Sequence, residues 1–414
     1  MNRIAPRCSV RHAAAANDRI PLSSCAYGGS ALGDVQPCIP RVPNLGVTVI
    51  STPSDLPPPT RRSVLTATTG LAFLTAGCAA DAQPNRSKAT EHPGAKAPDA
   101  HRALSRQQGI SDPQPLHTAV AAYDMAPRLR GSTGISTVRT VLTVWSALPL
   151  PGDTTFTVAL GPSFYDRLGL TAPPLLRAIP RFPHDRLNPQ ISDGDILVQM
   201  CSDDPDAIRA VFPLLAKASA GATVRRWQEY GFLPPGPKGE TPRNHFGFKD
   251  GTENPTPAEA DRWVWNPDGS TYLVYRRIRM DVSEFGALPR TRREAAIGRD
   301  LITGAPLGAE REHDPVNLFA KSPHGRYIIP VNAHVRLAHS RLDGGARMLR
   351  RGYSYDNGPD DRGLLFLAYM RDPALFVRVQ ERLDRSDAMS KFVEHRASAV
   401  GYVLPTPVFK WLPG

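Results

Sequence analysis

The first residue with an evident chemical use is Asp250, which lies in the stretch NHFGFKDGTENP at residues 244–255. Glycine allows close backbone approach and positive φ, and the Asn-Pro pair is a turn signal. Asp250 is therefore predicted on a tight loop, next to Phe246 and Phe248. A carboxylate beside aromatic rings is poorly solvated, which suits it to carry a proton near neutral pH. Taken alone, however, such a stretch is more often only an Asp-Gly turn.

Two further stretches carry groups that complement this carboxylate. His334 lies in NAHVRLAH at residues 332–339, between small and apolar residues, and a neutral imidazole is a common metal ligand. His339, in the same stretch, is the rival ligand. Arg350 lies in MLRRGYSY at residues 348–355. Its guanidinium stays charged at any working pH and can stabilise developing negative charge.

In this order, the three stretches resemble the motifs of dye-decolorising peroxidases. GFKDGTEN is similar to the Gly-Phe-Lys-Asp-Gly-Thr-x-Asn form of the family signature, HVRL to its axial His-x-Arg-Leu segment, and LRRGY to its Leu-Arg-Arg-Gly-Tyr segment. The exported subgroup that includes deferrochelatase/peroxidases is closest in pattern, and the resemblance covers residues 106–412. It implies one haem b per chain with His334 as iron ligand, and catalytic roles for Asp250 and Arg350 on the distal haem face.

The resemblance also implies further haem contacts besides His334 and Arg350, namely Gly251, Thr252, Glu253, His339, Ser340 and Arg341. Two departures from the family pattern fall within this set. Glu253 stands where the family often has Gly, which would place a carboxylate near the haem edge, and His339-Ser340 replaces a common Asn-Pro. The family also has a carboxylate that accepts a hydrogen bond from the axial histidine, for which Asp361 is a candidate by its position.

The function that the resemblance implies is the oxidation of organic electron donors, such as dyes or phenols, by hydrogen peroxide. An alternative from another class is a haem-handling protein, a deferrochelatase, that releases iron from haem in an iron-uptake system. A third interpretation is a ferredoxin-like binding module without haem. For bulky donors that cannot reach a buried haem, the candidate electron relays are Trp263, Trp265, Tyr353 and Tyr355, although each is more often a core residue.

The elements that must position these residues are predicted from hydrophobic periodicity. In the first half, strands are predicted over residues 118–125, 154–160, 195–201 and 224–232. The stretch 138–148 is also mostly apolar and β-branched, as is usual in strands. Residues 203–218 predict a helix, because apolar residues recur there at helical spacing. Strands with one helix between them fit a ferredoxin-like α+β unit.

The same pattern returns after the Asp250 loop. Strands are predicted over residues 271–280 and 363–370, and an amphipathic helix over residues 373–383. Together with the resemblance, this implies an α+β fold of two ferredoxin-like domains with antiparallel sheets, at residues 106–245 and 246–414. The haem pocket is then expected mainly in the second domain.

Residues 1–105 divide into three segments before the folded part. Residues 1–59 lack helical or strand periodicity and are predicted to be disordered or not translated. Residues 60–82 place two arginines before a short apolar run with small residues at its end, which resembles a twin-arginine export signal. Residues 83–105 are polar and rich in Pro, Ala and Lys, as expected of a flexible linker.

The signal predicts export by the twin-arginine translocase to the periplasm, the cell surface or the medium. The sequence LTAGC, ending at Cys78, resembles a lipobox, in which the acylated cysteine would anchor the protein to a membrane. Thr75 stands there in place of the usual Leu. Residues 80–82 (ADA) offer an ordinary cleavage site instead, so the sequence leaves a lipoprotein and a soluble mature form as alternatives.

Composition sets limits on other functions. Hydrophobic residues make up 41% and charged residues 21% of the chain, as in ordinary globular proteins. The net charge of +11 is spread along the chain without a long basic run, so we expect a solvated basic surface and no nucleic-acid partner. Four of the five cysteines precede residue 80, which argues against a disulfide framework. A homo-oligomer is compatible with the sequence, which does not set the oligomeric state.

Overall fold

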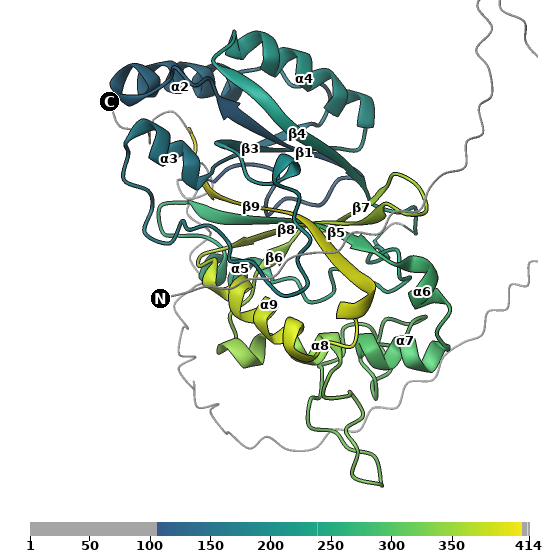
Figure 1. Cartoon of the computed structure of the whole chain (residues 1–414). Coiled ribbons are helices and arrows are strands. Elements are labelled where there is room, and N and C mark those ends of the chain that lie inside the picture. The colour runs from purple at the N-terminus through teal and green to yellow at the C-terminus, as the bar shows by residue number, and fades with distance from the viewer. Residues whose placement is uncertain (1–105, 238, 408–411, 413–414) are drawn as a thin grey trace, which may run out of the picture. The chain divides into compact units, whose positions relative to one another are not determined.

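The computed structural model describes residues 106–237, 239–407 and 412, which form two antiparallel sheets with helices on their outer sides (Figure 1). The predicted leader (1–59), the export signal with Cys78 (60–82) and the linker (83–105) lie outside the described residues. No helix within the described part is long and apolar enough to cross a membrane.

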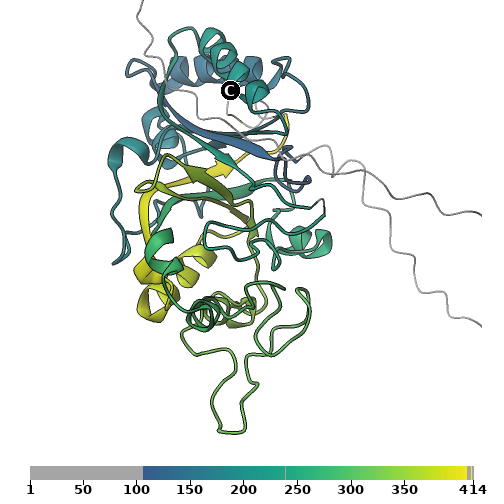
Figure 2. The same ribbon diagram turned by 90° about the vertical axis from the view of Figure 1, so that its right-hand side faces the viewer.

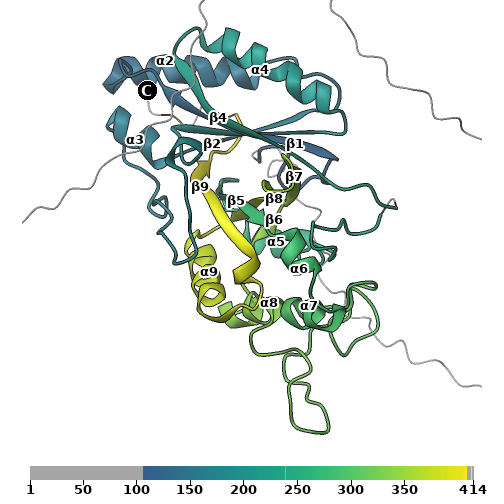
Figure 3. The ribbon, with the colours of Figure 1, turned by 45° about the vertical axis from the view of Figure 1, so that its right-hand side comes forward.

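The first sheet has the strand order β4-β1-β3-β2 and is antiparallel throughout. Its strands are β1 (His117–Met125), β2 (Thr155–Leu160), β3 (Ile196–Ser202) and β4 (Thr223–Phe232). Helices α2 and α4 cover its outer face (Figure 3). The helical elements of this half are α2 (Gly131–Ser146), α3 (Pro162–Leu168), the 3-10 helix η1 (Pro189–Ile191) and α4 (Pro205–Ser219).

The second sheet repeats this order as β9-β5-β8-β7, with the short β6 also pairing with β8. Its strands are β5 (Thr271–Met280), β6 (Leu349–Arg350), β7 (Tyr353–Asp356), β8 (Arg362–Met370) and β9 (Val393–Val403). The helical elements are α5 (Pro257–Trp263), α6 (Val282–Gly286), α7 (Arg290–Ile297), α8 (His334–Leu337), η2 (Ser340–Asp343), α9 (Ala374–Ser386) and η3 (Ser390–Phe392). The repeated order confirms the predicted two ferredoxin-like sheets.

The two sheets join at their edges, and this turns the strands into a closed ring. β2 pairs with β9 only at Leu160 and Tyr402, and β4 pairs with β7 only at Phe232 and Ser354. The inner faces enclose an apolar and aromatic cluster, in which Trp227 and Tyr275 stack with their ring centroids 5.1 Å apart. The interior of the ring is therefore packed with side chains, and a large ligand has to bind on an outer face.

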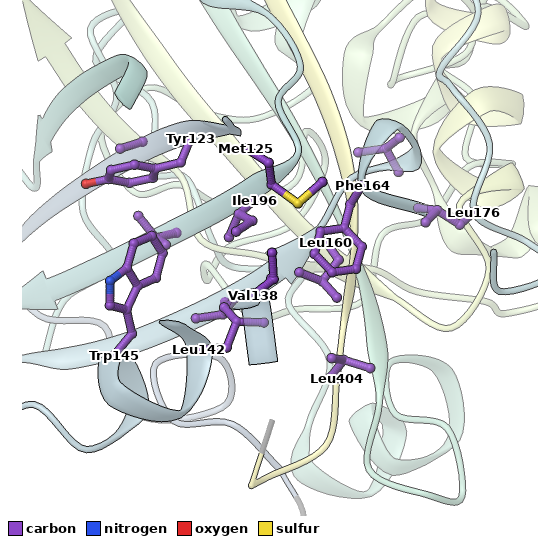
Figure 4. Close-up of a cluster of buried hydrophobic side chains, with 14 of the residues drawn as sticks. Tyr123, Met125, Val138, Leu142, Trp145, Leu160, Phe164, Leu176, Ile196 and Leu404 are labelled. Carbon is purple, nitrogen blue, oxygen red and sulfur yellow. The ribbon is translucent and has the colours of Figure 1, made fainter. Parts of the chain in front are cut away.

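A second cluster packs on the outer face of the first sheet, beneath α2 (Figure 4). Trp145 of α2 meets Tyr123 of β1 edge to face, with ring centroids 5.0 Å apart, and its Nε1 donates to the carbonyl oxygen of Leu215 at 3.2 Å. Burying large aromatic side chains in this way supplies much of the stabilisation of such a core.

The interpretation of residues 138–148 as strand-like is wrong, because these residues form most of α2. Their buried members Val138, Val141, Leu142 and Trp145 recur at helical spacing and face the sheet. The interspersed threonines fit the helix because their hydroxyls donate to the carbonyl four residues before, as Thr143 does to Arg139 at 2.7 Å. The β-branched content masked a helical period that was present in the sequence.

The candidate electron relays are mostly core residues. Trp265, Tyr353 and Tyr355 are 1% exposed or less and belong to the cluster inside the ring. Trp263, at the end of α5, is half-buried and lies under the guanidinium of Arg262, 4.5 Å from the ring centroid. A relay role for any of the four stays a prediction.

The pairing of β8 with β5 predicts a glycine requirement at Gly363. A Cβ at this position would collide with the carbonyl oxygen of Ile278, which is backbone and cannot rotate away. We expect Gly363→Ala to lower the free energy of unfolding by about 1–3 kcal/mol, the usual cost of overpacking. Urea unfolding followed by circular dichroism measures this.

Gly286→Ala is the matched control, because no atom lies within 4 Å of its added Cβ. It should leave stability unchanged or raise it by up to about 1 kcal/mol. Equal midpoints for the two variants would contradict the close approach of β5 and β8.

Candidate active site

One large cavity lies between the outer face of the second sheet and helices α8 and α9. It holds about 1750 Å³ of empty space, part of which is open to solvent. Asp250, His334 and Arg350, which the sequence analysis selected from three separate stretches, all line it. Most of the remaining wall is apolar and includes Ile278, Met280, Leu364, Phe366, Leu375, Phe376, Val379, Leu383 and Val393.

His334 is the first residue of α8 and is oriented by Asp387, which follows the end of α9. Its Nδ1 lies 2.6 Å from Oδ2 of Asp387, whose Oδ1 accepts a hydrogen bond of 2.9 Å from the backbone N–H of Met389. A proton on Nδ1 that is donated to this carboxylate leaves the lone pair of Nε2 free to bind a metal. Burial lowers the pKa of His334, but the charge and hydrogen bond of Asp387 outweigh it, so the pKa is raised above its ordinary value.

The prediction that Asp361 is the carboxylate partner of His334 is therefore wrong. Its two carboxylate oxygens accept hydrogen bonds of 2.9 and 2.7 Å from Arg277, whose guanidinium lies 4.0 Å from the ring centroid of Tyr355. Arg277 and Tyr355 belong to the inner side of the strand ring, whereas the cavity lies on the outer side. Alternation along β5 places Ile278, the next residue, on the cavity wall.

The predicted tight loop around Asp250 is confirmed. Gly247 and Gly251 have φ values of 86° and 126°, which side chains rarely allow. The backbone N–H of Asp250 donates to the carbonyl of Pro242 at 2.9 Å. Phe246 is buried below the loop, where its ring stacks on Phe285 with centroids 4.1 Å apart. The loop backbone is thus held on both sides while the carboxylate of Asp250 lines the cavity.

Asn254 ties this loop to the strand that carries Arg350. Its Nδ2 donates to the carbonyl oxygen of Arg350 at 2.8 Å, and its Oδ1 accepts from the backbone N–H of Arg350 at 3.0 Å. The alternation of β6 sends the neighbouring Arg351 the other way, where it is 3% exposed and donates to the carbonyls of Ile110 and Asp112. Sequence reasoning missed Asn254 as a positioning residue, although it lies inside the motif.

Charged groups cluster where the Asp250 loop meets the rest of the cavity wall. Glu253 accepts hydrogen bonds from Arg299 at 2.8 Å and from Arg347 at 3.2 Å. Burial lowers the pKa of Arg299, and the charge of Glu253 offsets this only in part. The carboxylate that departs from the family pattern is therefore paired with two cations. The two arginines lie far from Glu253 in sequence, and no local signal indicated this contact.

The other predicted haem contacts divide into two groups. Gly251, Thr252, Glu253, His339 and Ser340 line the cavity, whereas Arg341 does not and lines a separate hollow. Thr252 donates to Glu312 at 3.0 Å, and Glu312 also binds Lys249 at 2.6 Å. Burial lowers the pKa of His339, and although the charge of Glu253 opposes this, Arg347 and Arg341 lower it further, so the pKa lies below its ordinary value.

The residues present fit a porphyrin better than a bare metal ion. No group of three or more His, Cys, Asp or Glu side chains that could hold an ion occurs among the described residues. A cavity with extensive apolar walls and an imidazole whose Nδ1 is engaged by Asp387 suits an iron whose remaining ligands come from a macrocycle. Arg299 and Arg347 lie at one side of the cavity, where both pair with Glu253 and Arg347 also pairs with Glu259.

Comparisons with known proteins show which family the chain resembles. The family models "Dyp-type peroxidase, N-terminal" and "Dyp-type peroxidase, C-terminal" match residues 140–233 and 241–408. The chain is 37% identical over 349 residues to the dye-decolorizing peroxidase of Thermobifida fusca, covering 73% of this chain and 81% of that one. It is 32% identical over 405 residues to the deferrochelatase of Escherichia coli, covering 84% and 94%.

Solved structures show the same fold. The DyP-type peroxidase from Streptomyces coelicolor superposes with a TM-score of 0.70 at 31% identity, covering 75% of this chain and 96% of that one. An oxyferrous complex of DtpA from Streptomyces lividans gives a TM-score of 0.67 at 31% identity, covering 73% and 95%.

The contact between His334 and Asp387 predicts how the imidazole titrates in the haem-free protein. Asp387 favours the protonated ring, so Asp387→Asn should lower the pKa of His334 and leave burial as the main influence. Because the folded-state pKa is raised in the wild type, this histidine stabilises the fold fully below its unfolded value of about 6.5, and the contribution is lost as pH rises through the folded value. Histidine titration by NMR measures both proteins, and equal pKa values would contradict the pairing.

Proposed function

The chain belongs to the DyP-type peroxidase family, and we propose that it uses hydrogen peroxide to oxidise organic donors such as dyes or phenols, with haem b bound in the cavity between the second sheet and α9. The observation that carries the proposal is the convergence of His334, Asp250 and Arg350 on one cavity of porphyrin-compatible lining. One haem is proposed per chain, with His334 as its iron ligand.

Each of these residues has a proposed task that its surroundings support. His334 holds the iron through Nε2 while Asp387 accepts the proton of Nδ1 and keeps the ring in that orientation. When bound, haem supplies the redox-active iron that electrons pass through. Asp250 accepts a proton from hydrogen peroxide and returns it to the departing oxygen, and the guanidinium of Arg350 stabilises the charge that develops there.

The remaining wall residues are proposed to hold the cofactor. Gly251, Thr252 and Glu253 line the cavity from the Asp250 loop, and His339 and Ser340 line it from the start of η2. Glu253 is paired with Arg299 and Arg347, so it adds no unpaired negative charge near the haem. Arg341 is assigned no haem contact, because it does not line the cavity.

The alternative function, iron release from haem by a deferrochelatase, is compatible with the same cavity. It is supported by relatives of that name, of which the one from Escherichia coli aligns with 84% of this chain. The two functions give different products from haem-loaded protein. Iron release yields the fluorescence of metal-free porphyrin without peroxide, whereas a peroxidase keeps its haem and turns over donor. The interpretation as a binding module without haem has no support from the family assignment.

We also propose that the protein is exported by the twin-arginine route, with Cys78 acylated or the signal cleaved at residues 80–82. The support is the sequence of residues 60–82, and the need to bind haem before export is consistent with a route that carries folded proteins. Replacing Arg61 and Arg62 by Lys should retain the precursor in the cytoplasm, and unchanged export in cell fractions would refute the proposal.

Iron ligation by His334 is tested by absorption spectroscopy of protein purified with haem supply. The wild type should show a Soret band, and His334→Ala should lose or shift it, because the imidazole that Asp387 orients in the cavity is gone. His324→Ala, an exposed histidine on the connection between α7 and α8, is the control and should match the wild type. An unchanged band in His334→Ala would transfer ligation to His339 or another residue.

The roles of Asp250 and Arg350 are tested by stopped-flow mixing of the haem-loaded protein with hydrogen peroxide. Asp250→Asn should slow the change in the Soret band by about 10²–10⁴-fold, as expected for loss of a general base. Arg350→Leu should slow it by about 10²–10³-fold, as for loss of one charge-stabilising donor. Asp360→Asn, on an exposed turn, is the control. Wild-type rates in both site variants would refute these assignments.

A further inference from the structure

A second hollow lies directly beside the proposed haem cavity. It is formed by the connection between α7 and α8 and by the start of η2, and it holds about 1300 Å³ of space, part of it open to solvent. In Figure 2 this connection extends beyond the helices, away from both sheets. His339 and Ser340 line the hollow as well as the haem cavity, so the two spaces share these residues as a wall. The full lining is Pro315, Val316, Asn317, Leu318, Phe319, His339, Ser340, Arg341, Gly344 and Gly345.

The side chains of this hollow combine an exposed aromatic ring with an uncompensated positive charge. The ring of Phe319 is 64% exposed, and the guanidinium carbon of Arg341 lies 5.2 Å from its centroid. No carboxylate occurs among the ten lining residues, and within the described part of the chain Arg341 forms no ion pair. The adjacent Asp343 points elsewhere, since Arg378 and Arg382 bind its two oxygens.

Phe319 is held in place although it is exposed. The side-chain oxygen of Asn317 accepts hydrogen bonds of 3.0 Å from the backbone N–H groups of Phe319 and Ala320. The carbonyl oxygen of Ala320 accepts a hydrogen bond of 3.0 Å from the N–H of Ile328, which joins two segments of the connection between α7 and α8. An aromatic surface that is fixed before binding loses little conformational entropy when a flat ligand stacks on it.

We propose that this hollow, lined by Phe319 and Arg341 and walled off from the haem cavity by His339 and Ser340, binds the electron donor, and that the donor is an aromatic anion such as a sulfonated or carboxylated dye. The inference rests on the proposed peroxidase function and adds the donor's place and chemical class. A donor ring stacks on Phe319, and its acidic group pairs with the guanidinium of Arg341.

The position of the hollow explains how a bulky donor is oxidised without entering the haem cavity. Two donor molecules each lose one electron, and with two protons these electrons convert one hydrogen peroxide into two waters. Only electrons have to cross the wall formed by His339 and Ser340. No Asp or Glu occurs among the lining residues, so an anionic donor meets no competing carboxylate there.

The test uses the haem-loaded full-length protein and two donors, a sulfonated anthraquinone dye and the neutral phenol guaiacol. Arg341→Gln should raise KM for the dye about tenfold with kcat nearly unchanged, because it removes one charge-assisted contact. The same variant should change KM for guaiacol less than twofold. Phe319→Ala should raise KM for both donors. Arg326→Gln, an exposed arginine of the same connection outside the hollow, is the matched control and should change neither value.

Equilibrium dialysis of the dye with the resting enzyme, without peroxide, gives a readout that is independent of turnover. The dissociation constant should rise about tenfold in Arg341→Gln, while the Soret band and its rate of change on mixing with peroxide stay at wild-type values. Unchanged dye binding in Arg341→Gln and Phe319→Ala would overturn the inference, as would an equal rise in Arg326→Gln. If the wild type does not react with peroxide, the proposed function fails, and dialysis still decides whether the hollow binds the dye.

Discussion

The amide of Asn254 makes the contact on which the arrangement of the site depends. Its side chain donates to the carbonyl oxygen of Arg350 and accepts from the N–H of Arg350, as a neighbouring strand would do. These two hydrogen bonds attach the Asp250 loop to β6. β6 is itself held to β8 through Leu349 and Arg350. The other contacts of the loop, such as the hydrogen bond from Asp250 N–H to Pro242, hold it to different parts of the chain and not to β6. A displacement of a catalytic group by about 1 Å is enough to lower the rate a hundredfold. The amide of Asn254 therefore matters for a reaction that needs Asp250 and Arg350 at a fixed distance from each other.

The opposite wall of the cavity depends on a comparable single contact, between His334 and Asp387. Asp387 is almost fully buried, and a buried carboxylate is tolerated only where donors satisfy it, which the imidazole and the N–H of Met389 do. The two walls are built from different parts of the chain: the Asp250 loop and β6 on one side, α8 and the end of α9 on the other. The fold brings them together because β8 runs directly from the β6–β7 segment into α9.

The parts of the fold and of the site that could be predicted from the sequence are those set by residues close together in the chain. Asp250, His334 and Arg350 could be selected from the sequence because each lies in a short motif that resembles one of the family's, and the structure places all three on one cavity. Strands β1 to β5 and β8 were predicted because their apolar patterns are local. Strands β6, β7 and β9 were not predicted, and α2 was taken for strand-like because β-branched residues hid its period. Asp387, Arg299 and Arg347 could not be found, since each meets its partner through tertiary structure. The prediction that Asp361 is the partner of His334 failed for the same reason. Asp361 was chosen by its position in the sequence, but in the fold its carboxylate pairs with Arg277 on the inner side of the ring.

The closed ring of strands has a consequence for where electrons from a donor can enter the protein. Its interior is filled by Trp227, Tyr275 and their neighbours, so it offers no room for a donor. The haem cavity lies on the outer face of the second sheet, against α8 and α9, and only Arg299 of the connection between α7 and α8 lines it. Phe319 and Val331 of that connection are exposed apolar residues, and Phe319 lies at the hollow that shares His339 and Ser340 with the cavity. The proposed donor site is therefore separate from the packed ring of strands and depends on the connection and the start of η2.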